Sequence, residues 1–223
     1  MYKKEIFRDL DKKYNSHLYS GLLGIVMNYC HKTLENFKLK NKSFDKILEI
    51  GAGSAPHYNY IKHDYNEYHI VDTSDFAKDF HKNNDKVKFL SYDGKVLPYE
   101  NQTFDRIIIS HTLEHIIDFE NFLNEMIRVI KKNSVISIAS PCDNGFLWRL
   151  GRYILKKTYH KLNKTSEIDY NYFMAKEHVN TIFQIISVLK KNFNIQSEIY
   201  LPFRIKIIDI NLIHICHIIK NKY

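Results

Sequence analysis

The sequence has few cysteines and no cysteine motif. Its three cysteines, Cys30, Cys142 and Cys216, lie far apart, and none belongs to a C-x-x-C pair. Structural zinc sites and disulfide frameworks need clustered cysteines, so we expect neither, and no metal site is predicted. Such cysteine usage fits a reducing compartment, and we expect a cytoplasmic location.

Long apolar runs are also missing. The two most apolar stretches, residues 18–30 and 205–219, are interrupted by polar residues such as Asn28 and Asp209. Neither reaches the roughly 20 apolar residues of a membrane span. The charged N-terminus is not followed by the apolar stretch of a signal peptide, so we expect no export. Peripheral contact with a membrane stays open.

Repeats and low-complexity tracts are absent as well. The 223 residues are 44% hydrophobic and 26% charged, which is ordinary globular usage, and we expect one domain over residues 1–223. The formal net charge is +8. This excess fits an anionic partner, but lysine is used heavily throughout the chain, so a general compositional bias is the competing interpretation.

Short apolar runs alternate with helical patterns from Lys46 onward, which is typical of βαβ units and a mostly parallel sheet. The pattern predicts an α/β fold whose seven-stranded sheet has helices on both faces. Predicted strands are 46–50, 68–72, 87–90, 104–110, 134–139, 195–201 and 211–219, and the last two form an antiparallel pair. Predicted helices are 56–64, 119–131, 180–192 and one from Thr73 or Ser74 to about 81; the crossover between Asp93 and Phe104 is too short for a full helix.

Two segments stand outside this alternation. Residues 1–40 are helical in pattern, and we expect an N-terminal helical cap or lid. Residues 142–177 contain a basic aromatic stretch, 146–153, and are predicted to form an insertion over the sheet on the substrate side. Pro141 precedes the insertion and is expected to leave the strand ladder, because proline has no amide hydrogen to donate.

A glycine turn follows the first predicted strand. Glu49 ends this strand, Gly51 and Gly53 follow, and a helix is predicted next, which is a nucleotide-binding arrangement. A dinucleotide-binding loop would have a third glycine where Pro56 stands, and a phosphate-binding loop would need Gly-Lys-Ser/Thr. Both are absent, which opposes NAD and nucleoside triphosphates as ligands.

Residues 44–140 resemble the class I S-adenosylmethionine-dependent methyltransferases. The family motif E-x-G-x-G-x-G is matched by Glu49, Gly51 and Gly53, while Ala55 replaces the third glycine. The strings Leu97-Pro98-Tyr99 and Phe104-Asp105-Arg106 resemble the family's L-P-F and F-D-x-I/V. The resemblance implies a Rossmann-like fold, S-adenosyl-L-methionine as cofactor and S-adenosyl-L-homocysteine as product.

The resemblance also implies which residues hold the cofactor. Glu49 would orient the loop and the methionine amino group, and the glycines would let the backbone approach the methionine part. Asp72 would bind both ribose hydroxyls, and Asp93 would accept a bond from the adenine amino group; alternatively, Asp72 starts a helix and Asp93 lies in a plain turn. The predicted cofactor-binding residues are Glu49, Gly51, Ala52, Gly53, Asp72, Thr73, Asp93, Gly94 and Ser110.

The candidate catalytic residues are two histidines. His111 follows the fourth strand, where the family places a loop beside the transferred methyl group, so it is predicted to flank the sulfonium or the acceptor. His178 lies where family members bring a residue over the acceptor, although it could instead cap the helix near Asn180. A base is needed only if the acceptor must lose a proton, because methyl transfer chiefly requires alignment and exclusion of water.

Substrate contacts are predicted on the insertion. Arg149 and Arg152 share a helix face with Lys156 and could hold a phosphate, a phosphonate or a nucleotide-linked sugar, although a solvated basic face is the alternative. Tyr58 and His115 are further predicted substrate contacts.

The predicted function is methyl transfer to a small, anionic biosynthetic acceptor, for example in a cell-surface polysaccharide pathway. A lipid head-group methyltransferase, with residues 18–30 or 146–160 on the membrane, is an alternative. Nucleic acid is a less favoured partner, because the Asn/Asp-Pro-Pro-Tyr/Phe motif is absent. A non-catalytic scaffold that binds the cofactor is opposed by the retained Glu49, Asp72 and Asp93. The sequence gives no indication of oligomeric state.

Overall fold

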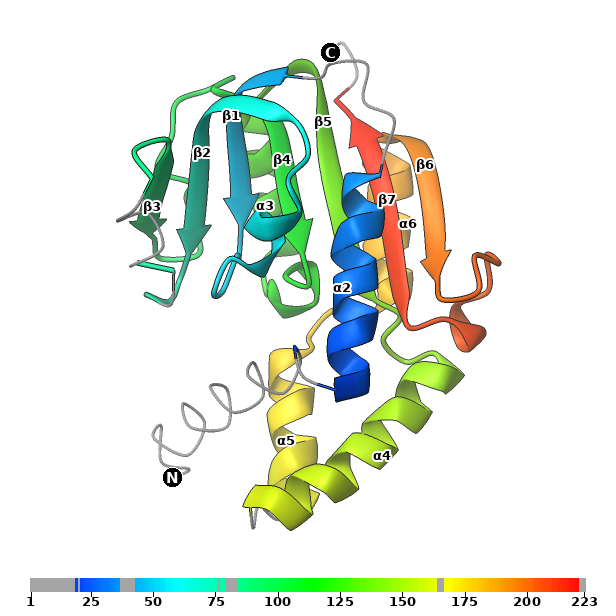
Figure 1. Cartoon of the computed structure of the whole chain (residues 1–223). Helices are drawn as coiled ribbons and strands as arrows, with labels where there is room; N and C mark the ends of the chain where they lie inside the picture. Colours follow the sequence, from blue (N-terminus) through cyan, green and yellow to red (C-terminus); the bar gives the residue numbers. More distant parts are fainter. Residues whose placement is uncertain are drawn as a thin grey trace.

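Seven strands form one mixed sheet in the computed structural model, which describes residues 19, 21–36, 43–75, 77–78, 84–163 and 167–220. The strand order is β3-β2-β1-β4-β5-β7-β6 (Figure 1). β7 runs antiparallel to both β5 and β6, and the other pairings are parallel. The predicted sheet is confirmed. Its strands are β1 Ser43–Ile50, β2 Asp64–Asp72, β3 Val87–Ser91, β4 Phe104–Ser110, β5 Ile130–Pro141, β6 Asn194–Leu201 and β7 Ile213–Ile219.

Helices cover both faces of the sheet, as predicted. α2 (Gly21–Glu35) lies on one face and buries Met27, Cys30 and Leu34 against the strands. α3 (Phe119–Val129) and α6 (Ile182–Asn192) pack on the other face. Because both faces are covered, the central strands are apolar on both sides. Of the predicted N-terminal cap, residues 21–35 form a helix that belongs to a packed layer, and residues 1–18, 20 and 37–40 lie outside the described residues.

The helix predicted for residues 56–64 is wrong. Only a short 3-10 helix forms, η1 (Pro56–Tyr60), after Ala55 in a left-handed conformation with φ 54°. The chain then turns into β2 at Asp64, which pairs with Ser43 of a β1 that is longer than predicted. Strand pairing takes Asp64, the last residue of the predicted helix, and residues 61–63 belong to neither a helix nor a strand.

Three further boundaries differ from the prediction. α3 ends at Val129, because Ile130 already pairs with Phe104 as the first residue of β5. Pro141 does not leave the ladder but ends β5 opposite Ile213. Residues 73–75 and 77–78 form bends and turns, and the rest of the helix predicted to residue 81 lies outside the described ranges. The fully described crossover 92–103 contains no helix, as predicted.

The insertion consists of two helices, α4 (Phe146–Asn163) and α5 (Glu167–Glu177). Both lie beyond the carboxyl ends of β1 and β4 (Figure 1). α6 follows α5 and begins with a capping box, in which Thr181 and Gln184 bond each other's backbone amides. The insertion thus stands over the sheet edge where open α/β sheets bind ligands.

Candidate active site

The glycine turn after β1 touches the loop after β4. Gly51 and Gly53 have φ values of 67° and 55°, a region that favours glycine. A Cβ on Gly51 would overlap the side chain of Thr112, whose hydroxyl donates to the Gly51 carbonyl (3.2 Å). At Gly53 a Cβ would meet no atom within 4 Å, so a ligand can approach the backbone there.

Two carboxylates lie near the strand ends beside this turn, and one of them, Asp72, bonds it directly. Glu49 is buried and accepts a bond from the Tyr68 hydroxyl (2.6 Å), and burial raises its pKa. Asp72 accepts the Gly53 amide on Oδ2 (2.7 Å) and the amide and hydroxyl of Ser74 on Oδ1 (both 2.7 Å). Since a carboxylate has about four acceptor positions, one stays available on Asp72. Binding both ribose hydroxyls, as the resemblance implies, would require one of the three protein donors to move.

The loops after β2 and β3 bring the other predicted cofactor residues together. A Cβ on Gly94, which has φ 79°, would lie 3.2 Å from the methyl group of Thr73. Asp93 is exposed, and the amides of Lys95 and Val96 lower its pKa by bonding its carboxylate. Ala52 is buried, and its carbonyl accepts the amide of Ala55 (2.7 Å). An open Gly53 and an exposed Asp93 on adjoining loops fit a nucleoside cofactor along this edge.

His178 forms a close pair with Asp143. Its Nδ1 lies 2.7 Å from Asp143 Oδ2, and the two side chains are 9% and 6% exposed. Beside an ionised carboxylate, which can only accept, His178 donates from Nδ1, and in the neutral ring Nε2 is then the proton acceptor. The arrangement is that of a histidine base oriented by a carboxylate.

Backbone hydrogen bonds join the segment after His178 to the loop after β4. The amides of Val179 and Asn180 donate to the Glu114 carbonyl (2.9 and 3.1 Å). The Asn180 side chain donates to the carbonyls on either side, at Leu113 and Ile116 (2.9 and 2.6 Å). The cap of α6 is Thr181, so His178 does not cap that helix.

Two more histidines lie in this cluster. The His115 ring packs against the His178 ring with centroids 5.0 Å apart, and His115 Nδ1 donates to the Glu177 carbonyl (2.7 Å). His111 Nε2 lies 3.7 Å from the buried Cys30 thiol. Burial, with the nearby His115 and His178, lowers the pKa of His111 to about 4. His111 is therefore neutral near pH 7.

Unpaired polar atoms gather at the carboxyl ends of β4 and β5. Within the described part of the chain, four buried side-chain oxygens there have no hydrogen-bond partner: Ser110 Oγ, Glu114 Oε2, Ser140 Oγ and Asp143 Oδ1. Burial also raises the pKa of Glu114 to about 7. Buried polar groups without partners are costly, and such groups mark sites where a ligand can supply the missing bonds.

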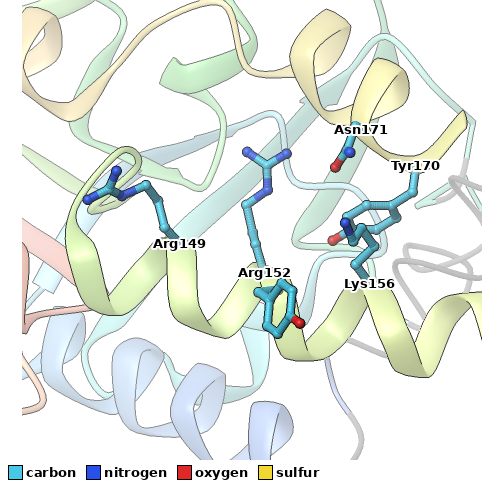
Figure 2. Close-up of a pocket in the computed structure, with 6 residues that line it drawn as sticks. Arg149, Arg152, Lys156, Tyr170 and Asn171 are labelled. Atoms are coloured by element: carbon cyan, nitrogen blue, oxygen red, sulfur yellow. The ribbon is translucent and has the colours of Figure 1, made fainter. Parts of the chain in front are cut away.

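A basic hollow of about 200 Å³ lies between α4 and α5 (Figure 2). Arg152 stacks over the Trp148 ring at 4.7 Å, and the Trp148 and His178 ring centroids are 5.6 Å apart. Trp148 therefore connects the hollow to the His178–Asp143 pair. The hollow is lined by Arg149, Arg152, Tyr153, Lys156, Tyr170 and Asn171.

Tyr58 is not brought to these residues. Its hydroxyl bonds that of Tyr65 (2.7 Å), near the amino ends of β1 and β2, and its ring packs edge-on to Tyr68. Arg149, Arg152 and His115 do lie around one region, formed by the basic hollow, Trp148 and His178. The contacts of Tyr58 are instead those of a packing residue.

Sequence reasoning missed Asp143, Thr112 and the contact of Trp148. Asp143 stands two residues beyond the end of a parallel strand, and this position at the carboxyl edge was the signal that could have found it. Thr112 contacts Gly51 and Trp148 contacts His178, and such contacts between distant segments cannot be predicted from a local sequence pattern.

Comparisons with known proteins agree with this geometry. Residues 48–138 match the family model of a methyltransferase domain. A demethylmenaquinone methyltransferase of Corynebacterium urealyticum is 28% identical over 117 residues, which are 50% of each chain. The family match and this relative support assignment of the chain to the class I S-adenosylmethionine-dependent methyltransferases. The chain spans about half the length of that curated relative.

Solved structures of low sequence identity show the same fold. The N-methyltransferase NodS from Bradyrhizobium japonicum, in complex with S-adenosyl-L-homocysteine, has a TM-score of 0.61 at 12% identity, over 87% of both chains. The [4+2]-cyclase SpnF has a TM-score of 0.62 at 12% identity, over 86% of this chain and 80% of its own. Since a cyclase shares the fold, the fold alone does not identify the reaction.

Proposed function

We propose that this chain binds S-adenosyl-L-methionine and transfers the methyl group to a small anionic acceptor that loses a proton. The observation that carries the proposal is the His178–Asp143 pair, 2.7 Å apart and packed between the family's β4 loop and a basic hollow. The family match over residues 48–138 supports the cofactor and the class of reaction.

The loops at the carboxyl edge would hold the cofactor, which supplies a methyl group on positively charged sulfur. Gly53 leaves room for the methionine part, Asp72 has one acceptor position for a ribose hydroxyl, and the exposed Asp93 can accept from the adenine amino group. His111 and Ser110 line the loop on the side of the transferred group. His111 is neutral, so it does not repel a sulfonium cation.

The His178–Asp143 pair would then act on the acceptor. His178 Nε2 accepts the proton that an acceptor hydroxyl or amine loses as it takes the methyl group. Asp143 holds the ring in position through Nδ1 and stabilises the imidazolium that results. The nearby Glu114, whose pKa burial raises to about 7, adds little negative charge below neutral pH.

Charge in the hollow selects the acceptor. Arg149, Arg152 and Lys156 face the same hollow, and guanidinium groups bind phosphate or phosphonate oxygens through paired hydrogen bonds (Figure 2). The acceptor we propose carries such a group, as phosphorylated and nucleotide-linked sugars do. A cell-surface polysaccharide pathway and a cytoplasmic location are consistent with this proposal and stay predictions.

A lipid-borne acceptor is the second candidate. Three large apolar residues of α4 are exposed: Phe146 (59%), Leu150 (43%) and Ile154 (57%). The curated relatives include several named demethylmenaquinone methyltransferases. Among the described residues, no helix is long and apolar enough to cross a bilayer.

The test of the proposal is identification of the methylated compound. The chain is incubated with isotopically labelled S-adenosyl-L-methionine and fractionated cell extract, and mass spectrometry finds the compound that gains the labelled methyl group. His178→Asn should lower kcat by roughly 10²- to 10⁴-fold, the usual contribution of a general base. Arg149→Gln with Arg152→Gln should raise KM instead, while Lys86→Gln with Lys88→Gln, two exposed lysines at the start of β3, serves as the charge-matched control. A labelled compound whose methylation His178→Asn leaves unchanged would contradict the role of the pair.

A further inference from the structure

The loop between β6 and η4 (Ile208–Ile210) exposes apolar side chains that alternate with basic ones. Phe203, Ile205 and Ile207 are 58%, 52% and 50% exposed, and Arg204 and Lys206 stand between them. A single exposed apolar residue is common on a protein surface. Three of them within five residues indicate an interaction surface.

A buried asparagine fixes this loop. Asn211 is fully buried, and its amide nitrogen donates to the carbonyls of Ile205 (2.8 Å) and Ile207 (2.7 Å). Its side-chain oxygen accepts the amide of Phe203 (3.1 Å). These three bonds hold the loop backbone in one conformation, in which the apolar side chains face solvent.

The first turns of α4 continue this surface. The Phe146 amide donates to the Asp209 carboxylate of η4 (3.0 Å), so α4 begins directly beside the loop (Figure 1). Phe146 and Leu150 are one helical turn apart and both exposed. We call residues 203–207 with Phe146 and Leu150 the basic apolar edge.

The two stretches of sequence that carry the edge, 203–207 and 146–157, hold charges of one sign, although the carboxylates of Asp209 and Glu198 contact them. No acidic residue occurs in 203–207 or in 146–157, whereas the two stretches hold six basic ones: Arg149, Arg152, Lys156, Lys157, Arg204 and Lys206. Arg204 donates to the Tyr29 hydroxyl (3.0 Å), and Lys206 lies 3.1 Å from Glu198 with its side chain still 68% exposed. The positive charges thus reach solvent beside the apolar groups.

We propose that the basic apolar edge docks this protein on membranes that contain anionic lipids. Apolar side chains entering the headgroup region and cations facing anionic lipid are the two contributions to such binding, and the edge supplies both. A second copy of the chain would set like charges against each other, which disfavours it as the occupant. α4 also contributes Arg149 and Arg152 to the hollow, so docking places the hollow near the lipid surface. The inference does not depend on methyl transfer.

Vesicle flotation tests the inference on the full chain. Vesicles of phosphatidylcholine with phosphatidylglycerol in equal parts are compared with vesicles of phosphatidylcholine alone. The protein should float with the anionic vesicles, and high salt should weaken this binding. Phe203→Ser with Ile205→Ser and Ile207→Ser should lower the partition coefficient by about tenfold or more, since apolar burial supplies much of the affinity. Arg204→Gln with Lys206→Gln should lower it as well.

Phe183→Ser is the matched control, because Phe183 is 62% exposed on α6, outside the edge. It should float like the unaltered chain, and thermal unfolding checks that every variant folds. Failure of the unaltered chain to float, or flotation of the folded triple variant to the same extent, would overturn the inference. So would sedimentation that shows a dimer which the triple variant abolishes, because the occupant would then be a second copy.

Discussion

A buried ion pair under α2 predicts a large, measurable loss of stability when one partner is removed. Glu35 of α2 and Arg106 of β4 have fully buried side chains, and Glu35 Oε1 lies 2.7 Å from Arg106 Nη2. His57 Nε2 lies 2.9 Å and His63 Nδ1 3.3 Å from the same carboxylate. Glu35→Gln would leave the Arg106 charge buried without a counterion. Breaking a buried pair in this way costs about 3–5 kcal/mol of unfolding free energy.

The surface ion pair of Glu67 provides the matched control. Glu67 Oε1 lies 2.8 Å from Lys88 Nζ, but the two side chains are 29% and 51% exposed. Glu67→Gln should therefore cost at most about 1 kcal/mol. Urea unfolding near pH 7, followed by circular dichroism, measures both variants. The double variant Glu35→Gln, Arg106→Met should lose less than Glu35→Gln alone, because it removes the uncompensated charge.

The same pair predicts a pH dependence. Burial alone would raise the pKa of Glu35, but the bonds from His57 and His63 and the charge of Arg106 outweigh it, so the pKa is lowered. A lowered carboxyl pKa gives stability that is fully present above the ordinary carboxyl pKa and is lost as the pH falls from there through the lowered pKa. Glu35→Gln should flatten this acid loss. A Glu35→Gln variant no less stable than Glu67→Gln would refute the account of a buried charge pair.

Further predictions concern the site. Gly51→Ala should abolish cofactor binding in a chain that still folds, because its Cβ would overlap Thr112 at φ 67°; calorimetry measures the loss. Glu114→Gln should stabilise the fold by up to about 3 kcal/mol at pH 8 and by nothing at pH 4. The reason is that a carboxyl group with a raised pKa costs stability as the pH rises from the ordinary carboxyl range to about 7. Equal shifts of the melting temperature at both pH values would contradict this. Thr181→Ala should cost about 1 kcal/mol through loss of the α6 cap, seen in urea unfolding.

The layered fold could be predicted from the sequence, because its evidence is local. The alternation of apolar runs with helical patterns located all seven strands, and a covered sheet explains why those strands are apolar. Local pattern misjudged residues 56–64, since pairing of Asp64 with Ser43 is a contact between segments far apart in sequence. The buried Arg106 could not be foreseen either, because its counterion lies on a helix more than seventy residues earlier.

The motif residues of the candidate site could be predicted from the sequence, but their hydrogen-bond partners could not. Glu49 and Asp72 lie at the carboxyl ends of the neighbouring strands β1 and β2, and Gly53 lies in the turn between β1 and η1. Nothing local indicated that Asp72 accepts the Gly53 amide from the turn after β1, nor that Asp143 would orient His178. These bonds join residues from separate elements, so they exist only in the folded chain.

The most direct test of the central claim is a calorimetric titration of S-adenosyl-L-homocysteine into the intact chain. The account predicts binding, and it predicts that Asp72→Ala weakens the affinity by about tenfold or more, because one charge-assisted bond to the ribose and the anchored Gly53 turn are lost together. Asp75→Ala, in the same loop but outside the site, should bind like the unaltered chain. No binding by the folded, unaltered protein would contradict the claim that this edge is a cofactor site.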